Sequence, residues 1–400
     1  MITDLSYWLV LLGAAVVFWL IPDRFRVSFL GIVSVGLLLP ADWMAVVSLI
    51  VWTSAFYYCS RHLNGGDESK RRILSWLIWG LIAQLAFFKL RPALLGQFIS
   101  DNEAVMSLVL PFGISYFTFK LIHYALETRR GNIKQHDFSI FFLYIFFFPI
   151  YPAGPIERFD AFIKNRSKTI NSADIADGLT RIAHGLIKKF VIAEGIIIPL
   201  MSAPLVAQAV NDPELASWMR TWMYVVLFFI YAYLDFSAYS DIAIGSSRLF
   251  GFRIMENFNF PVLASNIQVF WQRWHISLSG WCRAYIYMPM IGLTRNPTHA
   301  VLATMATIGL WHGATLNWLF WGLYHAVGII FYGHFQRFMR KRYKYRPSKH
   351  PLAKGLGIAF TMVFVTGSYA FAATDKSGTV LDGFYLLIKL LTGIYLPSVM

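Results

Sequence analysis

Long apolar runs recur along the chain, and most of them have the length that crosses the hydrocarbon core of a membrane. In the N-terminal part these runs cover residues 5–21, 27–39, 41–58, 73–90 and 105–126. A helix needs about 20 residues to span about 30 Å of hydrocarbon, and the second run is short of this length. The sequence therefore predicts an all-α protein that begins with a bundle of membrane-spanning helices.

The composition agrees with a membrane protein. Charged residues make up 14% of the chain and hydrophobic residues 57%, whereas soluble proteins carry about 25% charged residues. An excess of 35 Lys and Arg over 21 Asp and Glu gives a formal net charge of +14, which in a soluble protein would suggest a nucleic-acid partner. In a membrane protein, basic cytoplasmic loops account for such an excess. We therefore expect a lipid bilayer around the chain and no nucleic acid as a partner.

Basic residues fall in alternate connections between the runs, as the positive-inside rule requires. These connections contain Arg24 and Arg26, then Arg61, Lys70, Arg71 and Arg72, then Arg129, Arg130 and Lys134. The first run has neither a basic start nor a cleavage site of small residues, so we expect it to remain as a membrane helix. This pattern predicts that the N-terminus lies outside the cell.

Residues 138–152 form an intensely aromatic segment with basic residues on both sides. Both flanks are expected in the cytoplasm, and Pro149 and Pro152 interrupt its end. The segment is also short for a crossing. We expect a re-entrant or in-plane helix that packs against protein, with an ordinary short span as the alternative.

Further spans are expected at residues 178–210, 218–239, 355–373 and 380–396. Residues 248–295 are less apolar and are expected to form partly sunken structure that faces the cytoplasm. Residues 300–333 are too long for one crossing, so this run must break, and the polar stretch 311–315 is the expected place. The basic run 337–354 predicts a solvated cytoplasmic loop that is attracted to anionic lipid.

Ionisable side chains inside apolar sequence mark the places where chemistry is expected. Each costs about 2.5–3.5 kcal/mol on insertion scales unless a partner or a cavity offsets the cost. The places are Lys120 with His123, the stretch from Asp235 to Asp241, the stretch from Trp271 to Ser279, and His312. Cys59 and Cys282 stand in apolar or aromatic surroundings and predict neither a disulfide framework nor a cysteine metal site.

Asp235 and Asp241 are six positions apart, which places them far apart around an ideal helix. They are therefore not expected to form a paired acid and base. Two interpretations stay open. The carboxylates either cap a helix end and bond to neighbouring spans, or they support a catalytic group.

Residues 270–279 combine two tryptophans, an arginine and a histidine with hydroxyl groups. Such a group suits an interfacial site for an anion or a carbonyl group, because an arginine donates in a fork and indole rings exclude water. Anchoring in the aromatic belt of a membrane would explain the tryptophans, but not His275.

His312 stands alone in an apolar run, where a histidine is more often a satisfied structural residue than a catalyst. His275 is expected near the cytoplasmic side and His312 near mid-depth. Together they suggest the two ends of one polar path.

Seven motifs stand between residues 110 and 314: LPFGISYFTF at 110–119, FFPIYPAGPIERF at 147–159, DFSAYSDIAIG at 235–245, NFNFP at 257–261, FWQRWHISLSGW at 270–281, YIYMP at 285–289 and GLWHGA at 309–314. With these motifs the chain resembles the membrane-bound O-acyltransferases, in particular the bacterial members that O-acylate cell-envelope polymers. The resemblance implies a ring of about eleven transmembrane or re-entrant helices around a thinned core. A central tunnel would let a cytoplasmic acyl donor meet an acceptor from outside.

The resemblance places the family's invariant histidine on His312 and its partner polar position on His275, and these two are the expected catalytic residues. Around them, substrate binding is expected from Asp235, Tyr239, Asp241, Asn257, Trp271, Arg273, Trp274, Ser277 and Trp311. No metal site is expected. The chain divides into N-terminal transmembrane helices at 1–104, a catalytic core at 105–333, and a basic loop with C-terminal helices at 334–400.

The expected reaction passes an acyl group from a cytoplasmic thioester, either acetyl coenzyme A or the phosphopantetheine arm of a carrier protein, with no tightly bound cofactor. His312 would act as general base and His275 would orient or stabilise the thioester carbonyl. A covalent acyl-histidine intermediate is an alternative. The resemblance further implies the bacterial cytoplasmic membrane and a periplasmic acyltransferase as partner.

The transferred group stays open between acetyl, expected on an envelope polysaccharide, and D-alanyl, expected on a teichoic-type polymer. The chain reads Ala238 where the alginate-acetylating branch usually has glycine, and Met290-Ile291-Gly292 where that branch has a glycine pair. An acyl channel without chemistry and an assembly scaffold are the alternatives outside the enzyme class. Two imidazoles at membrane depth favour the enzyme, because they are costly in a scaffold.

Overall fold

The computed structural model describes residues 2–61, 68–95, 113–133, 136–151, 153–208, 212, 217–344, 350–375 and 379–395. These residues form helices joined by turns and contain no strand. A single antiparallel bridge joins Arg166 to Phe252. The expected all-α fold class is therefore confirmed.

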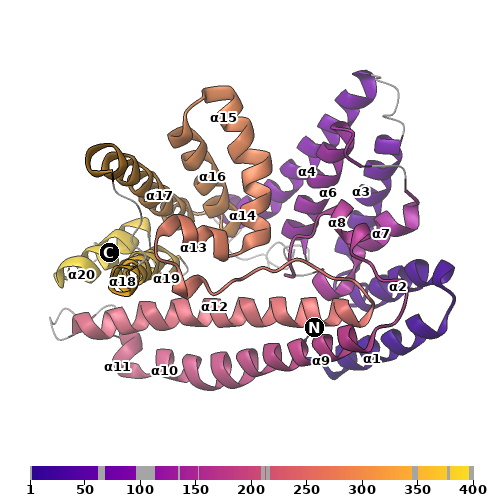
Figure 1. Ribbon diagram of the computed structural model, residues 1–400, viewed down its shortest axis with the longest axis horizontal. Coiled ribbons are helices and arrows are strands. Elements are labelled where there is room, and N and C mark those ends of the chain that lie inside the picture. The colour runs from indigo at the N-terminus through magenta and orange to yellow at the C-terminus, as the bar shows by residue number, and fades with distance from the viewer. Residues whose placement is uncertain are drawn as a thin grey trace. The chain divides into compact units, whose positions relative to one another are not determined.

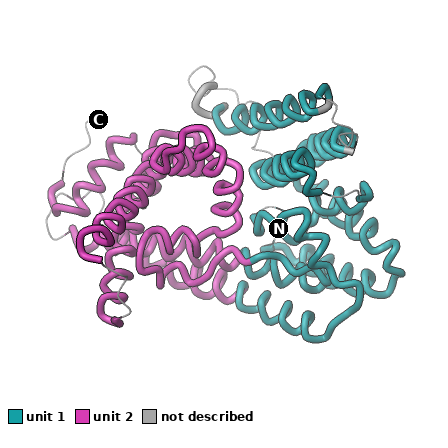
Figure 2. The backbone as a smooth tube through the Cα atoms, turned by 45° about the horizontal axis from the view of Figure 1, so that its top comes forward, with its two compact units in different colours: residues 1–185, 239–255 teal, residues 186–238, 256–400 magenta. Residues whose placement is uncertain are grey.

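The chain forms two compact units, coloured separately in Figure 2. Unit 1 contains residues 1–185 and 239–255, and unit 2 contains residues 186–238 and 256–400. The long helix α12 (Ser217–Leu249) contributes its first part to unit 2 and its last part to unit 1. The functional division at residues 104 and 333 stays a prediction.

Unit 1 is built from the N-terminal helices (Figure 1). They are α1 (Leu5–Leu20), α2 (Asp23–Leu38), α3 (Trp43–Arg61), α4 (Glu68–Leu95), α6 (Ile114–Arg129), α7 (Phe138–Phe146), η1 (Phe148–Ile150), α8 (Phe159–Lys164) and α9 (Ser172–Leu186). Each of the first four apolar runs forms a helix, as expected. The fifth run is described from residue 113 onwards, and its residues 105–112 lie outside the described residues.

The aromatic segment after residue 137 forms a short helix that protein surrounds. Helix α7 has 9 residues, a rise of about 14 Å, which is half of the hydrocarbon thickness. Phe141 and the residues from 143 to 150 are buried within the protein. The expectation of a short helix packed against protein is confirmed for the described part, and Pro152 lies outside it. That the segment does not cross the membrane stays a prediction.

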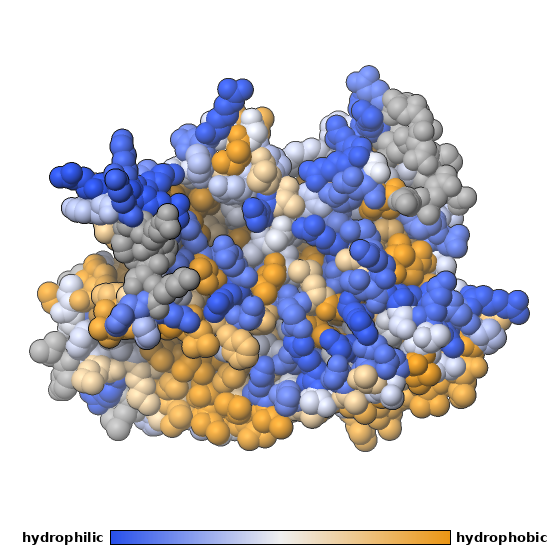
Figure 3. Space-filling model, in the orientation of Figure 1, coloured by the Kyte–Doolittle hydropathy of each residue, from blue (hydrophilic) through white to orange (hydrophobic). Residues whose placement is uncertain are grey.

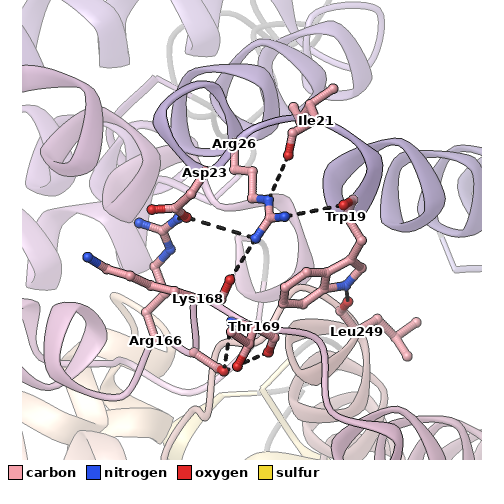
Figure 4. Close-up of polar contacts among 9 residues, drawn as sticks. Trp19, Ile21, Asp23, Arg26, Arg166, Lys168, Thr169 and Leu249 are labelled. Atoms are coloured by element: carbon pink, nitrogen blue, oxygen red, sulfur yellow. Dashed lines mark hydrogen bonds and ion pairs between the residues drawn. The ribbon is translucent and has the colours of Figure 1, made fainter.

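A polar cluster closes the end of α1 (Figure 4). The Arg26 guanidinium donates to the carbonyl oxygens of Trp19, Ile21 and Lys168 at 2.8–3.2 Å. Carbonyls at the end of a helix have no partner within the helix, so these bonds satisfy them. Asp23 pairs with Arg166 beside this cluster. Arg26 therefore has a structural role in addition to its place in a basic connection.

The run expected as a span at 178–210 differs from the prediction. Helix α9 leads into an 11-residue π-helix, η2 (Ile187–Ile197), and then into α10 (Ile198–Ser202). This stretch does not meet the length and hydropathy criteria that α3, α4, α12 and the stretch Pro351–Ala373 meet. The stretch carries the charged residues Arg181, Lys188, Lys189 and Glu194, and charged side chains are costly inside lipid.

Helix α12 is longer than the span expected at 218–239, because the polar stretch from Asp235 to Asp241 does not end it. The expectation that these carboxylates cap a helix end is therefore wrong. They lie in the helix interior and pair with cations of neighbouring helices: Asp235 with Lys189 in unit 2, and Asp241 with Arg181 in unit 1. The other part of that interpretation, bonds to neighbouring helices, is confirmed, and the alternative, support of a catalytic group, stays a prediction.

Unit 2 contains the remaining helices. They are η2, α10, α11 (Pro204–Ala207), the first part of α12, η4 (Pro261–Leu263), α13 (Ile267–Arg273), α14 (Ile276–Cys282), η5 (Arg283–Tyr287), α15 (Met288–Thr294), α16 (Pro297–His312), α17 (Leu316–Tyr343), α18 (Pro351–Gly367), α19 (Tyr369–Ala373) and α20 (Val380–Thr392). The indole N–H groups of Trp218 and Trp222 both donate to the carbonyl oxygen of Leu390, which fastens α20 to the start of α12.

The run at 300–333 breaks where the sequence predicts. Helix α16 ends at His312, and α17 begins at Leu316 with Thr315 as its N-terminal cap. The two helices then cross at glycines: a Cβ atom on Gly309 would overlap the carbonyl of Trp318, and one on Gly322 would overlap the carbonyl of Met305. This close crossing places His312 at the turn.

Two expectations near the C-terminus need correction. The basic run at 337–354 is not wholly a loop, because α17 continues to Tyr343 and α18 begins at Pro351. Arg and Lys are good helix formers, and in the last turn they interact favourably with the helix dipole. The final helix, α20, has 13 residues and ends at Gly393 in the left-handed region, so it is shorter than expected.

The surface supports a multi-pass membrane protein. In Figure 3 hydrophobic side chains gather over α10 and α12, while hydrophilic side chains cover the tips of α15 and α17. Among the described residues, α3, α4, α12 and the stretch Pro351–Ala373 are long and apolar enough to cross a membrane. Large apolar side chains on them, such as Trp76 and Phe360, are 74% exposed, as lipid-facing residues are.

The glycine crossing predicts a specific sensitivity. We expect Gly309→Ala to lower the free energy of unfolding by about 1–3 kcal/mol, because the added methyl group meets a backbone carbonyl that cannot move independently. Gly292→Ala in α15 is the matched control, since nothing lies within 4 Å of its added atom. The measurement is thermal unfolding in detergent, followed by size-exclusion chromatography. Equal unfolding temperatures for the two variants would contradict this prediction.

Candidate functional site

Unit 2 brings three histidines together around tryptophan rings. The Trp311 ring lies 5.9 Å from the His275 ring and 4.7 Å from the His312 ring, centroid to centroid. The Trp321 ring lies 5.2 Å from His312 and 4.7 Å from His325. Aromatic contacts therefore connect all three imidazoles.

His275 is buried, with 1% of its surface exposed, and it lies at the sharp turn between α13 and α14. Its φ of 44° falls in the left-handed region, which costs a residue other than glycine about 1–2 kcal/mol. Such a conformation persists only where the surroundings fix it. Here the backbone N–H of Ile276 donates to the carbonyl of Asn257 at 2.9 Å and holds the turn.

The Asn257 side chain also sets the protonation pattern of His275. Its Oδ1 lies 2.8 Å from the Ser277 hydroxyl, 3.4 Å from the Ser277 backbone N–H and 3.1 Å from Nδ1 of His275. A backbone N–H can only donate, so the Asn257 atom facing it must be the oxygen. Nδ1 of His275 must then be the donor. In the neutral ring, Nε2 consequently carries a lone pair and no proton.

Nε2 of His275 is buried and has no hydrogen-bond partner among the described residues. Burial lowers the pKa of His275 well below its ordinary value, and the charge that His312 can carry lowers it further. His275 lies outside the four candidate spans. A neutral imidazole that offers one buried lone pair is therefore the state this site provides.

His312 has the opposite environment. It is the last residue of α16 and is exposed in the structure. Its ring stacks on Trp318, with centroids 4.9 Å apart and 23° between the planes, and it meets Trp321 edge-on. The tryptophans fix the imidazole while leaving it open to a second reactant.

His325 is a part of this site that the sequence reasoning missed. It is 1% exposed, and its Nε2 lies 3.1 Å from the Ser368 hydroxyl. Ser368 donates its own proton to the carbonyl of Val365, so His325 donates and its Nδ1 carries a lone pair. The helical spacing of Trp318, Trp321 and His325 places these side chains on one face of α17 and could have revealed it.

A cavity of about 730 Å³ lies beside these residues within unit 2. Trp271 and Ile276 line it next to His275, and Val301, Met305, Ile308, Ile329 and Ile330 supply apolar wall. Arg283, His334 and Arg337 also line it. Its volume lies within the range of small-molecule sites, about 300–1,000 Å³. It therefore combines an apolar wall with cationic groups.

The other residues predicted from the motif at 270–281 do not all line the cavity. Trp271 lines the cavity, but Arg273 does not, and its guanidinium lies 3.4 Å from the carbonyl oxygen of Leu263. The Trp274 ring stacks between Phe270 and Phe229, at 5.5 and 5.7 Å. Arg273 and Trp274 therefore hold local structure in the described contacts.

Two of the predicted residues on α12, Asp235 and Asp241, bind cations of other helices within their own units. Asp235 is bound to Lys189, while the neighbouring Phe236 ring lies 4.7 Å from His275. Tyr239 and Asp241 belong to unit 1. A substrate-binding role for Asp235, Tyr239 and Asp241 stays a prediction.

The polar pair singled out on α6 is satisfied within unit 1. Lys120 donates to the carbonyl of Tyr144 at 3.0 Å, and His123 accepts from the backbone N–H of Phe159 at 3.1 Å. Among the described residues no group of three or more His, Cys, Asp or Glu side chains could hold a metal ion. Neither Cys59 nor Cys282 forms a disulfide bond with another described residue.

The chain belongs to the membrane-bound O-acyltransferase family, whose model matches residues 67–372. The sequence resemblance and the polytopic helical fold are thereby confirmed.

Its relatives act on different polymers, according to their names. The chain is 32% identical to a probable alginate O-acetylase of Pseudomonas aeruginosa over 295 residues, which cover 68% of this chain and 54% of that protein. It is 31% identical to a peptidoglycan O-acetyltransferase of Helicobacter pylori over 64% of this chain and 54% of that protein. The chain thus matches little more than half the length of these acetylating relatives.

A third relative matches over nearly its whole length. This is a teichoic acid D-alanyltransferase of Bacillus subtilis, which is 28% identical over 389 residues. The match covers 91% of this chain and 94% of that protein.

The tautomer of His275 can be measured by 15N nuclear magnetic resonance on protein with labelled histidines. We expect a protonated Nδ1 and an unprotonated Nε2 at the ordinary histidine pKa of about 6.5 and above it, because burial lowers the pKa of His275 well below that value and keeps the ring neutral. Substituting His275→Gln identifies the signal, and Asn257→Ala should produce a mixture of tautomers. A His275 signal that titrates near pH 6.5 would show that the site holds a different proton arrangement.

Proposed function

We propose that the protein passes an acyl group, with acetyl as the first candidate, from a cytoplasmic thioester donor across the membrane for O-acylation of a cell-envelope polysaccharide. The observation that carries this proposal is the arrangement of two unlike histidines around Trp311. His275 is buried beside cavity-lining residues, whereas His312 is exposed. Such an arrangement lets a donor and an acceptor approach one reaction centre from different directions.

The cavity suits the arm of the thioester donor. Arg283 and Arg337 offer guanidinium groups to a phosphate, which is the pairing that arginine geometry favours. The apolar wall formed by Val301, Met305 and Ile308 would cover the pantetheine chain. The thioester would then lie near Trp271 and His275.

His312 serves in this proposal as the general base. It takes the proton of the acceptor hydroxyl, whose oxygen forms a bond to the thioester carbonyl carbon while the carbon–sulfur bond breaks. The thiolate leaves and takes up a proton. A positioned base contributes about 10²–10⁴-fold to such a step.

His275 receives a different role from the one expected from the sequence. Its neutral tautomer has a lone pair at Nε2, so it accepts a hydrogen bond and does not stabilise an oxyanion. An amide N–H of the pantetheine arm is a suitable donor to it. The indole N–H groups of Trp271 and Trp321 are buried without a hydrogen-bond partner among the described residues, so they can donate to the carbonyl oxygen instead.

D-alanyl transfer to a teichoic-type polymer is the second candidate. The observation in its favour is the match over 94% of the Bacillus subtilis relative, compared with 54% of the acetylating relatives. In either case we place the protein in the bacterial cytoplasmic membrane with its N-terminus outside. The basic end of α17 would face the cytoplasm, and a periplasmic acyltransferase would complete the transfer.

The proposal is tested by supplying the purified full-length protein in lipid with acetyl coenzyme A and, separately, with a D-alanyl-loaded carrier protein. We expect free thiol to be released from one of them, and His312→Ala to lower the rate about 10²–10⁴-fold while donor binding persists. His299→Ala is the matched control, because His299 is an exposed histidine near the other end of α16.

Release from acetyl coenzyme A supports acetyl transfer, and release from the carrier alone supports D-alanyl transfer. An unchanged rate in His312→Ala contradicts the proposal. Tolerance of both His312→Ala and His275→Ala, measured as polymer acylation in cells at equal membrane abundance, would identify an acyl channel without chemistry.

A further inference from the structure

Asp375 is the second residue after α19, and its carboxylate binds two residues at the start of α17. One oxygen, Oδ2, accepts from the indole Nε1 of Trp318 at 3.0 Å. The other, Oδ1, accepts from the hydroxyl of Thr315 at 2.5 Å. Neither the sequence motifs nor the proposed mechanism uses this carboxylate.

The indole that Asp375 binds is the one on which His312 stacks. The turn between α16 and α17 leaves room for this ring only because residue 313 is glycine, since a Cβ atom there would overlap the Trp318 ring. The ring is therefore held on one side by the carboxylate and on another by the backbone of the turn. Its position fixes one face of the His312 imidazole.

His312 depends on such contacts because it is the last residue of its helix and is exposed. A general base must lie within hydrogen-bond reach of the proton it takes, and a displacement of about 1 Å can cost about 100-fold in rate. We infer that Asp375 is a positioning residue, which holds the Trp318 ring against His312 and thereby orients the base. This inference rests on the proposed role of His312.

A purely structural role is already supplied by a neighbour. The Asn317 side chain donates to the Thr374 hydroxyl at 3.0 Å and lies 3.4 Å from the carbonyl oxygens of Phe371 and Thr379. Asn317 is buried, and these bonds fasten the end of α19 and the start of α20 to α17. Removal of the Asp375 carboxylate therefore leaves this connection in place.

The inference is tested by a double-mutant cycle on donor turnover in the full-length protein in lipid. We expect Asp375→Ala and Trp318→Phe each to lower turnover about 10–100-fold, with the KM for the donor changed by no more than about 3-fold. Turnover of the double variant should be at most about 2-fold lower than that of the slower single variant, because both changes remove the same contact.

Asp375→Asn should stay within about 3-fold of the parent rate, because its amide oxygen can still accept from Trp318 and its amide NH2 can donate to Thr315. Asp382→Asn is the matched control. Asp382 caps α20 in the same region through Thr379, and its loss should leave turnover unchanged. Multiplicative losses in the double variant, or full turnover in Asp375→Ala, would overturn the inference.

A second readout does not require turnover and therefore separates this inference from the proposed function. Diethyl pyrocarbonate modifies accessible histidines, and peptide mass spectrometry gives the rate at His312. We expect modification several-fold faster in Asp375→Ala than in the parent protein or in Asp375→Asn, because the freed Trp318 ring no longer covers one face of the imidazole. An unchanged rate of modification at His312 would contradict the positioning role, whichever donor the protein uses.

Discussion

The close crossing of α16 and α17 is the constraint on which the site depends. Gly309 and Gly322 let the two backbones approach until a single methyl group would overlap a carbonyl. This approach fixes where α16 ends and therefore where His312 lies. It also aligns Trp318, Trp321 and His325 along one face of α17, so one helix pair supports most of the aromatic surroundings of the histidines.

The two imidazoles, His275 and His312, lie in different surroundings and are suited to different roles. His275 is buried. Oδ1 of Asn257 accepts from Nδ1 of His275 and from the backbone N–H and hydroxyl of Ser277, which leaves the lone pair of the imidazole on Nε2. His312 is exposed, and its ring contacts those of Trp311, Trp318 and Trp321. The first arrangement suits recognition of a donor that enters a cavity, and the second suits a base that meets a separate acceptor.

Much of the helical order follows from the sequence, because apolar runs of membrane length leave few alternatives. The break at Gly313 was also predictable, since a polar and glycine-containing stretch interrupts a run too long for one crossing. The sequence could not show that α12 continues past Asp241, because the ion pairs to Arg181 and Lys189 that permit this come from distant residues. The roles of Asn257 and Asp375 were hidden for the same reason, since both depend on contacts across many residues of chain.

We expect a thioester donor to reach the space between His275 and His312 through the cavity of unit 2. The most direct measurement is a cryo-electron microscopy structure of the full-length protein in lipid with a non-hydrolysable acetyl coenzyme A analogue in which a methylene group replaces the sulfur. We expect the acyl carbonyl beside Trp271 and Trp321 and the phosphates near Arg283 and Arg337. An analogue bound at high occupancy elsewhere, with this cavity empty, would contradict it.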